Sequence, residues 1–523
     1  MRHTHTHTLT AFLTIALLAG SASAENRPDL ARDLDHPVLK VQPRTAAETA
    51  RIAPVLAPPA DFTKPEPFEE NPGGATTVRA RSTADAFSQP SGNMAFEREM
   101  DFKLGNGLFK KLWVSSPSST LASDGLGPVY NARSCQRCHL KDGRGHVPTG
   151  PDDSAVSMFL RLSVPAPDGS DMTEVETYLA ALGDTDRTRP DPVLGGQLQD
   201  FAIPGHAAEG QMRITYTDRP VTLSDGTVVT LQAPEYSVAD AGYGALSPDL
   251  QLSPRIAPTM LGMGLLEAIP AADILANADP DDANGDGISG RAQVAWSLEQ
   301  NRPMLGRFGW KAGNPSVRQQ SANAFAGDIG ISNPMFPYPA GDCTATQRDC
   351  TDAPHGDGDD RGFELDARGL DLVTFYSRNL GIPARRDVDD PQVLRGKAVF
   401  YQSGCASCHQ PKFVTDRVPD HPEQSFQLIW PHSDMLLHDM GEGLADHRPE
   451  SRATGREWRT APLWGIGLTK QVSGVEAYLH DGRARILLEA ILWHDGEAAT
   501  ARQSVMDLPA PDRDALIRYL ESL

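Results

Sequence analysis

Two short cysteine motifs are the parts of the sequence whose residue types and spacing most clearly specify chemistry. Four of the six cysteines form two Cys-x-x-Cys-His motifs, Cys135-Gln-Arg-Cys138-His139 and Cys405-Ala-Ser-Cys408-His409. Cysteines three residues apart lie on one side of a helical turn, so both can form thioethers with the two vinyl groups of one porphyrin. The next residue then points its imidazole at the iron. The motifs predict two covalently bound haems c, with His139 and His409 as proximal ligands.

Zinc and a redox dithiol are the competing interpretations of these motifs. A structural zinc site prefers four ligands gathered in one compact motif, whereas the pairs at 135–138 and 405–408 are far apart in the sequence. A thioredoxin-like dithiol does not require a histidine directly after the second cysteine at two places. Haem attachment is therefore the favoured interpretation.

The remaining two cysteines, Cys343 and Cys350, lie in a segment rich in proline and glycine. In an oxidising compartment, a local disulfide is the natural expectation for such a pair. Closing so short a loop contributes at most about 2.5 kcal/mol through chain entropy. We expect the bond to pin a loop, without a part in catalysis.

The N-terminus has the pattern of an export signal. Arg2 precedes an apolar run at 9–18, and Ala22-Ser-Ala24 is a small-x-small cleavage pattern. The run is shorter than the roughly 20 residues that span a bilayer, so it predicts a signal peptide over 1–24 and a mature chain beginning near Glu25. Covalent haem attachment also belongs to the exported compartment. We therefore expect a periplasmic protein.

Composition limits the partners of the chain. The formal net charge of −21 argues against nucleic acid, because binding phosphates needs a basic surface. The charge is compatible with a cationic redox partner, and equally with plain solubility. No stretch after the N-terminal run is long and apolar enough to cross a membrane, so we do not expect an integral membrane protein.

Composition shifts divide the 523 residues into parts that must position the two motifs. Residues 25–93 are rich in Pro and Ala and predict an extended arm that wraps a domain, or a partly disordered leader. Residues 94–385 form the expected N-terminal haem domain, with a β-rich insertion over 155–245 where apolar and polar residues alternate. Residues 386–523 form the expected C-terminal cytochrome c domain. Helices are expected at 260–278, 316–326, 365–376, 394–402 and 512–523. The predicted fold class is mostly α, with two cytochrome c-like haem domains facing each other across a cleft.

An acidic segment at 279–290 resembles the start of a calcium-binding loop. The candidate ligands are Asp279, Asp281, Asp282, Asn284, Asp286 and the carbonyl of Ile288. With Asp282 at the first loop position, the last position holds Gln293 where glutamate is expected. Asp279 and Asp281 can complete such a site. An acidic turn between helices remains the alternative.

Longer stretches around the motifs carry a family resemblance. They are 124–135 (Asp-Gly-Leu-Gly-Pro to Cys135), 141–145, 436–441, 459–467 (Arg-Thr-Ala-Pro-Leu-Trp-Gly-Ile-Gly) and 478–484. From about Phe62 to its end, the chain resembles the di-haem oxidoreductase, "putative peroxidase" family (thiol oxidoreductase-like), which is related to bacterial di-haem cytochrome c peroxidases. The resemblance implies that the N-terminal haem binds peroxide. It also implies that the C-terminal haem is six-coordinate and relays electrons from an external donor protein.

The resemblance also implies ligands for the relay haem. In the relatives, its distal ligand follows a His-x-Gly motif by fourteen residues. Here that motif begins at His480, and the corresponding position is His494. Met440 is the alternative ligand. His480 then becomes a group near a haem propionate or near the ligand, and Arg459 is expected to neutralise a propionate.

The distal side of the catalytic haem departs from the relatives. They carry an Asn-Pro-x-Glu motif whose glutamate is the acid/base, and the nearest match here, 333–336, ends in Phe336. That departure implies an apolar distal pocket, as in the di-haem rubber oxygenases. Glu267 is a candidate for the missing carboxylate, with a helix-surface glutamate as the alternative, and His206 is a weaker one. Trp310 resembles the tryptophan that bridges the two haems in the relatives; a core aromatic is the alternative.

The resulting functional hypothesis is a haem-dependent oxidoreductase that reduces a peroxide-like substrate. Hydrogen peroxide with two electrons and two protons would give water, with electrons entering through the C-terminal haem. Two alternatives remain. One is a pure electron-transfer cytochrome with both irons six-coordinate. The other is an oxidase that uses O2 or modifies a protein, which Phe336 favours.

Overall fold

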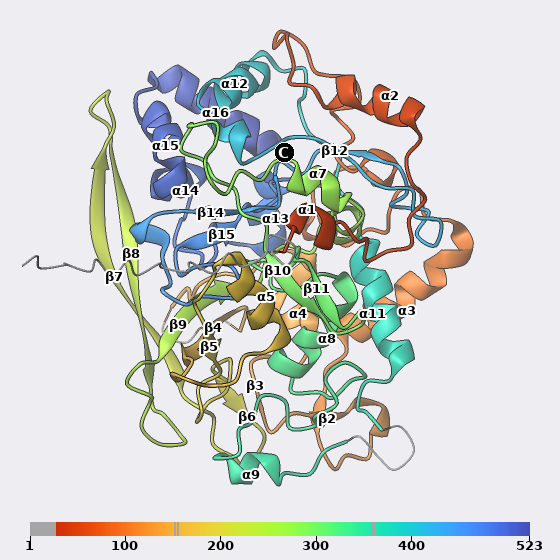
Figure 1. Cartoon of the computed structure of the whole chain (residues 1–523), viewed down its shortest axis with the longest axis vertical. Coiled ribbons are helices and arrows are strands. Elements are labelled where there is room, and N and C mark those ends of the chain that lie inside the picture. The colour runs from red at the N-terminus through yellow and green to blue at the C-terminus, as the bar shows by residue number, and fades with distance from the viewer. Residues whose placement is uncertain (1–27, 151–152, 154–155, 357–361) are drawn as a thin grey trace, which may run out of the picture.

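The computed structural model describes residues 28–150, 153, 156–356 and 362–523. The predicted signal peptide, 1–24, lies outside these residues. Helices account for 31% of the chain and strands for 17%. The expectation of a mostly α protein is therefore wrong, and the fold mixes short helices with many small sheets (Figure 1).

Most helices are three turns long or shorter. Their bounds are α1 Leu30–Asp33, α2 Ala46–Leu56, α3 Glu99–Lys110, α4 Cys135–Cys138, α5 Glu174–Leu182, α6 Met263–Glu267, α7 Ala271–Leu275, α8 Val317–Asp328, α9 Arg348–Thr351, α11 Ala367–Arg378, α12 Pro391–Gln402, α13 Thr469–Ser473, α14 Leu487–Trp493, α15 Ala499–Met506 and α16 Ala510–Ser522. The helices expected near 316, 365, 394 and 512 are present as α8, α11, α12 and α16.

The strands are distributed along the chain. They are β1 Val114–Ser115, β2 Asp124–Leu126, β3 Val129–Tyr130, β4 Met158–Pro165, β5 Thr188–Arg189, β6 Phe201–Ala202, β7 Gln211–Thr222, β8 Val228–Ala239, β9 Gln251–Ile256, β10 Val294–Ser297, β11 Arg302–Leu305, β12 Phe413–Val414, β13 Leu428–Ile429, β14 Leu437–Asp439 and β15 Glu457–Arg459. Two-stranded sheets such as β10–β11, β12–β13 and β14–β15 lie outside the predicted insertion.

Proline and glycine explain why the helical content is lower than expected. The chain has 42 prolines and 46 glycines. A proline inside a helix removes a backbone donor and clashes with the preceding turn. The expected helix over 260–278 is accordingly two short helices, α6 and α7, separated at Pro270, which is the N-cap of α7. Helical periodicity thus predicted the position of this segment but not its break.

The β-rich insertion is present and contains a long hairpin. Strands β7 and β8 pair antiparallel from Gln211 opposite Ala239 to Thr222 opposite Val228, and β4 pairs with β9. The hairpin stands along one side of the molecule next to α14 and α15 (Figure 1). At its tip, Asp225 accepts a 2.8 Å hydrogen bond from Arg513 of α16. The insertion therefore contacts the C-terminal part of the chain.

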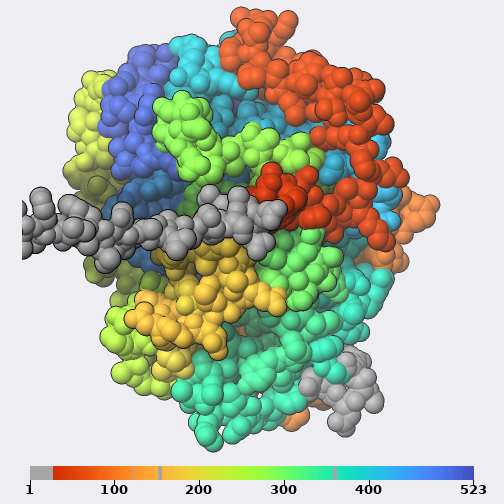
Figure 2. Space-filling view, viewed as in Figure 1, coloured from red at the N-terminus to blue at the C-terminus, as the bar shows by residue number. Residues whose placement is uncertain are grey.

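The described part of the N-terminal arm is packed along the surface of the rest of the chain (Figure 2). Arg44 pairs with Asp273 at 3.0 Å. Further along, the buried Glu69 pairs with Lys397 of α12 at 2.7 Å and with Arg385. Ion pairs thus hold the described residues of the arm against later segments of the chain.

Two helix groups place the two cysteine motifs. Helices α3, α8 and α11 share an apolar cluster with Cys135. Helices α12, α14 and α16 share another with Cys405. Close approach of α12 and α16 requires Gly396, because a Cβ there would lie 1.9 Å from the Ala515 carbonyl oxygen. Over the described residues, none of these helices has the length and hydropathy needed to cross a membrane.

Candidate functional site

One cavity of about 730 Å³ joins the two cysteine motifs. Its walls include all six residues of the motifs that carry chemistry, Cys135, Cys138, His139, Cys405, Cys408 and His409. None of these four cysteines is paired in a disulfide, so their sulfurs are available for thioethers. Two motifs far apart in the sequence thus face a shared interior space, as two linked cofactors would require.

The imidazole of His139 is oriented by a backbone carbonyl. Its Nδ1 donates to the oxygen of Pro258 at 2.8 Å. This contact fixes the ring and leaves Nε2 as the nitrogen that can bind a metal. Burial lowers the pKa of His139 to about 4, so the ring is neutral and its Nε2 lone pair is free for a metal. The aromatic ring in contact with His139 is that of Phe109, at 6.2 Å between centroids.

The second motif has two imidazoles facing each other. His409 Nδ1 donates to the carbonyl of His432 at 2.8 Å, and His494 Nδ1 donates to the carbonyl of Ala490 at 2.7 Å. The ring centroids of His409 and His494 are 6.5 Å apart. A metal bound between two imidazoles by bonds of about 2 Å separates ring centres by about 6 Å, since each centre lies about 1 Å behind its nitrogen. The pair therefore fits a single iron between its rings.

His494 is held at the end of α14. It follows Trp493 directly and is the C-cap of the helix. Leu492 and Trp493 pack in the same apolar cluster as Leu231 of the β7–β8 hairpin. Met440, the alternative ligand, also lines the cavity. Burial lowers the pKa of His494, which favours the neutral ring.

Arginines of the cavity wall that form no ion pair with a carboxylate include the buried Arg459 and the half-buried Arg144. Arg459 donates to the carbonyls of Gly309 and Thr460, at 3.1 and 3.0 Å. Arg144 donates to the carbonyl of Leu479 at 3.3 Å. Burial lowers the pKa of both guanidiniums to about 10, which still leaves them charged. Unpaired buried cations indicate an anionic ligand, and haem propionates have that chemistry.

Arg144 was not among the residues that the sequence singled out. Its only signal was membership of the 141–145 stretch that resembles the family. Only the three-dimensional arrangement shows that Arg144 forms no ion pair with a carboxylate of the chain.

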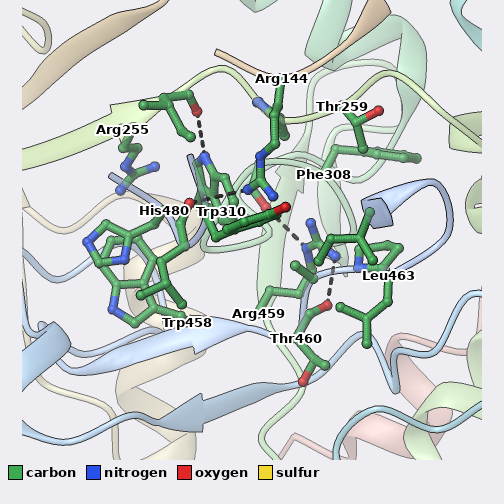
Figure 3. Close-up of a pocket in the computed structure, with 18 of the residues that line it drawn as sticks. Arg144, Arg255, Thr259, Phe308, Trp310, Trp458, Arg459, Thr460, Leu463 and His480 are labelled. Carbon is green, nitrogen blue, oxygen red and sulfur yellow. Dashed lines mark hydrogen bonds between the residues drawn. The ribbon is translucent and has the colours of Figure 1, made fainter. Parts of the chain in front are cut away.

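Trp310 and His480 lie in this part of the cavity wall (Figure 3). Trp310 Nε1 donates to the carbonyl of Ile256 at 2.7 Å. His480 stacks on Trp458 with 3.7 Å between ring centroids, and its buried Nε2 has no hydrogen-bond partner. Burial lowers the pKa of His480 to about 4. The Asp481 carboxylate is 3.8 Å from this nitrogen. An unsatisfied buried nitrogen in the cavity wall fits a group that contacts an absent polar ligand.

The expected distal residues lie outside the lining of the cavity. Glu267 is buried and uses both oxygens, accepting from the Val317 backbone at 2.8 Å and pairing with Arg378 at 2.7 Å. Phe336 packs at the edge of the cluster around α3, α8 and α11. His206 is not part of the lining either. Glu267 is therefore neither part of the cavity lining nor a helix-surface glutamate; it is a buried counterion of Arg378.

The acidic loop satisfies its own backbone. Asp279 accepts from Ala283 and Asn284, Asp282 from Gly287, and Asp286 from Ile288. Among the residues that the structure describes, no group of three or more His, Cys, Asp or Glu side chains has the geometry to hold a metal ion. The carboxylates of the loop are thus bonded to its own backbone amides, and calcium binding there stays a prediction. Asp286 and Ile288 do line the cavity.

Cys343 and Cys350 are paired, with 6.1 Å between their Cα atoms. Cys350 is fully buried beside Val129 and Ala340. Their bond joins the two ends of a surface segment that includes α9. The pair is not part of the cavity lining.

Comparison with known proteins places the chain. Residues 68–523 match the family described as "Di-haem oxidoreductase, putative peroxidase". No curated protein matches the sequence. A solved chain of hydrazine synthase from Kuenenia stuttgartiensis, pressurised with 20 bar xenon, has 18% identity and a TM-score of 0.21, covering 42% of this chain and 73% of its own. That low TM-score carries no argument. The family match, which spans most of the sequence, shows that the chain belongs to the di-haem oxidoreductase family.

Proposed function

We propose that this protein is an exported di-haem c-type cytochrome that reduces a peroxide-like substrate. Two haems follow from the family. In the proposal, each is attached through its cysteine pair, and His139 and His409 are the proximal ligands. The haem at His139 is the catalytic one, and the haem held between His409 and His494 relays electrons from an external donor protein.

The observation that carries the proposal is the difference between the two motifs. Within the described residues, His494 faces His409 at 6.5 Å, whereas no imidazole faces His139 at comparable range. Two strong-field imidazoles close an iron to exogenous ligands, while an iron with one protein ligand keeps a position for substrate. The arrangement supports an open site at the first motif and a closed site at the second.

The residues of the chain have separate tasks in this mechanism. Bound haems supply one-electron transfer and, at an open position, binding of an oxygen-containing ligand. His139, His409 and His494 hold and orient the cofactors through rings fixed by backbone carbonyls. Arg144 and Arg459 offset propionate charge inside the protein. Trp310 lies in the wall of the shared cavity, where a bridging aromatic residue is expected.

Consumption of peroxide by the reduced protein tests the proposal. Purified protein supplied with an artificial electron donor should reduce hydrogen peroxide with two electrons per molecule. The double variant Cys135→Ser/Cys138→Ser, which lacks the attachment site of the catalytic haem, should lose this activity but still accept electrons from the donor. Peroxide reduction at the wild-type rate by that variant, or none by the wild type, contradicts the proposal.

A pure electron-transfer cytochrome is the second candidate, because methionines line the cavity. Met260 and Met263 both belong to its lining, and a thioether can serve as a sixth ligand. In that case both irons would be closed, and the reduced protein would not bind carbon monoxide. The oxidase alternative relied on Phe336, which the structure leaves outside the cavity lining.

A further inference from the structure

The acidic side chains that line the cavity differ in whether they pair with a basic side chain. The acids in its lining are Asp286, Asp328, Glu450 and Glu497. Glu450 pairs with Arg255 at 2.7 Å and with Arg448 at 3.0 Å. Glu497 accepts from His438 at 2.7 Å. These two carboxylates are therefore fixed as counterions and are poor candidates for exchanging protons.

Asp286 and Asp328 lack such a pair, but they occupy different places. Asp286 lies in the acidic loop and accepts a hydrogen bond from the Ile288 backbone. The Asp328 carboxylate accepts only from the side-chain amide of Gln197, at 2.9 Å. Of the carboxylates that line the described cavity, Asp328 is the one held by a neutral side chain alone.

Asp328 is placed at the N-terminal motif by α8. It is the last residue of that helix, and Gln320, Ala324 and Asp328, at successive four-residue steps, all line the cavity. Burial, followed by the Asp328 carboxylate, raises the pKa of both Cys135 and Cys138. The carboxylate is therefore close enough to act electrostatically on the haem-attachment thiols.

The surroundings of Asp328 make its carboxyl group easier to protonate than a carboxyl group in water. Burial raises the pKa of this carboxyl group, while Arg161 and the Gln197 hydrogen bond act in the opposite direction. Gln197 is in turn fixed by Asn131, which holds the amide in place. A positioned carboxyl group with a raised pKa is a common form of general acid/base catalyst.

We propose that Asp328 is the acid/base residue of the catalytic haem site, the role for which Glu267 and His206 were the candidates from the sequence. This rests on the proposed peroxide reduction. The carboxylate accepts the proton of the peroxide oxygen that binds, and returns it to the oxygen that leaves as the O–O bond breaks. Two electrons from the donor and two protons from solvent complete the conversion of hydrogen peroxide to two water molecules.

Rapid mixing with two different ligands tests this assignment. Asp328→Asn should slow the reaction with hydrogen peroxide by about a hundredfold, in line with loss of a general acid/base, and Asp328→Glu should restore much of the rate. Asp349→Asn, at an exposed aspartate of α9, is the matched control and should react like the wild type. A peroxide rate unchanged in Asp328→Asn overturns the proposal.

Cyanide separates this assignment from the proposed function. Hydrogen cyanide must give up its proton when the anion binds a ferric iron, so its association rate also depends on a nearby base. If the wild type does not reduce peroxide but Asp328→Asn still slows cyanide binding, peroxide reduction fails and the base remains. If cyanide binds both proteins at one rate, or neither, Asp328 is not the base.

A second variant, which keeps the Asp328 carboxylate, tests the proposal if Asp328→Asn does not fold. Gln197→Leu removes the hydrogen bond that lowers the pKa of Asp328 and keeps the carboxylate. The pH at which the cyanide association rate rises should therefore move upward. A merely structural role would change haem content or stability but leave that pH unchanged, and this outcome overturns the proposal.

Discussion

The two haem-motif regions share a sequence pattern and differ in what surrounds their histidines. At the C-terminal motif, His409 faces His494 at 6.5 Å. At the N-terminal motif, the described residues place only the Phe109 ring against His139. The motif itself thus specifies attachment and one ligand, whereas the opposite face determines whether substrate can enter. In this protein α14 places His494 opposite His409, whereas no imidazole among the described residues faces His139 at comparable range.

The charges beside the attachment cysteines differ as well. His438 lies 3.7 Å from the Cys408 sulfur and is bonded to Asp434 and Glu497, each at 2.7 Å. Near Cys135 and Cys138, the unpaired Asp328 is the acidic neighbour. A network in which every charge is paired keeps one protonation state, whereas a carboxyl group outside any ion pair can exchange a proton. This difference agrees with a relay role for one region and a catalytic role for the other.

Removing one attachment motif should have the largest effect. Cys405→Ser/Cys408→Ser should leave one covalent haem per chain and abolish electron delivery from the donor, because thioether formation needs both sulfurs. Haem content after acid–acetone extraction checks this. Two retained haems in this variant would show that the C-terminal motif is not an attachment site.

Exchanging the second ligand should change the relay haem without removing it. His494→Ala should convert one low-spin haem to high-spin and raise its reduction potential, since a strong-field ligand is lost. His494→Met should stay low-spin with a raised potential, because a thioether favours the reduced iron. Absorption spectra and a redox titration measure both.

Met440→Ala is the control for the ligand exchange. Met440 lines the same cavity, and its loss should leave the low-spin spectrum unchanged. If Met440→Ala changes the low-spin spectrum and His494→Ala does not, the Met440 thioether is the ligand.

The paired network near Cys408 should appear in the pH dependence of stability. Burial opposes a charged His438, but Asp434 and Glu497 outweigh it and raise its pKa well above 6.5. Its contribution is thus complete below pH 6.5 and is lost as pH rises through the folded value. His438→Gln should cost about 3–5 kcal/mol near neutral pH, as breaking a buried pair does.

The difference in unfolding free energy between wild type and His438→Gln should shrink at alkaline pH. Denaturant titrations at a series of pH values measure it. A difference that grows with pH would mean that His438 is neutral in the folded protein.

Loosening the hairpin should give the smallest of these effects. Leu231 is 2% exposed and packs with Trp493, next to His494. Leu231→Ala should cost roughly 2–3 kcal/mol and leave part of the relay haem high-spin, because the cavity loosens the end of α14. Val228→Ala, at a 59% exposed position of the same hairpin, is the control and should change neither. If Leu231→Ala and Val228→Ala give the same haem spectrum, the hairpin does not hold His494 in place.

The mostly α fold class was wrong, whereas the ligand assignments stay predictions whose residues the structure brings together. The two motifs and the fourteen-residue spacing to His494 are short-range signals, and the structure brings these residues to one cavity. Helical content was overestimated because periodicity does not register breaks such as the one at Pro270. Asp328 and Arg144 were missed because their property, a charged group outside any ion pair, depends on distant segments. Glu267 carried a chemical signal but is used as a counterion of Arg378.

Carbon monoxide binding to the reduced protein distinguishes an open haem site from a closed one. One haem of two should bind the gas, at the His139 site, while the haem between His409 and His494 keeps its low-spin spectrum. His494→Ala should then allow binding at both haems. If the wild type binds no carbon monoxide, or binds it at both haems, the division into one open and one closed site is wrong.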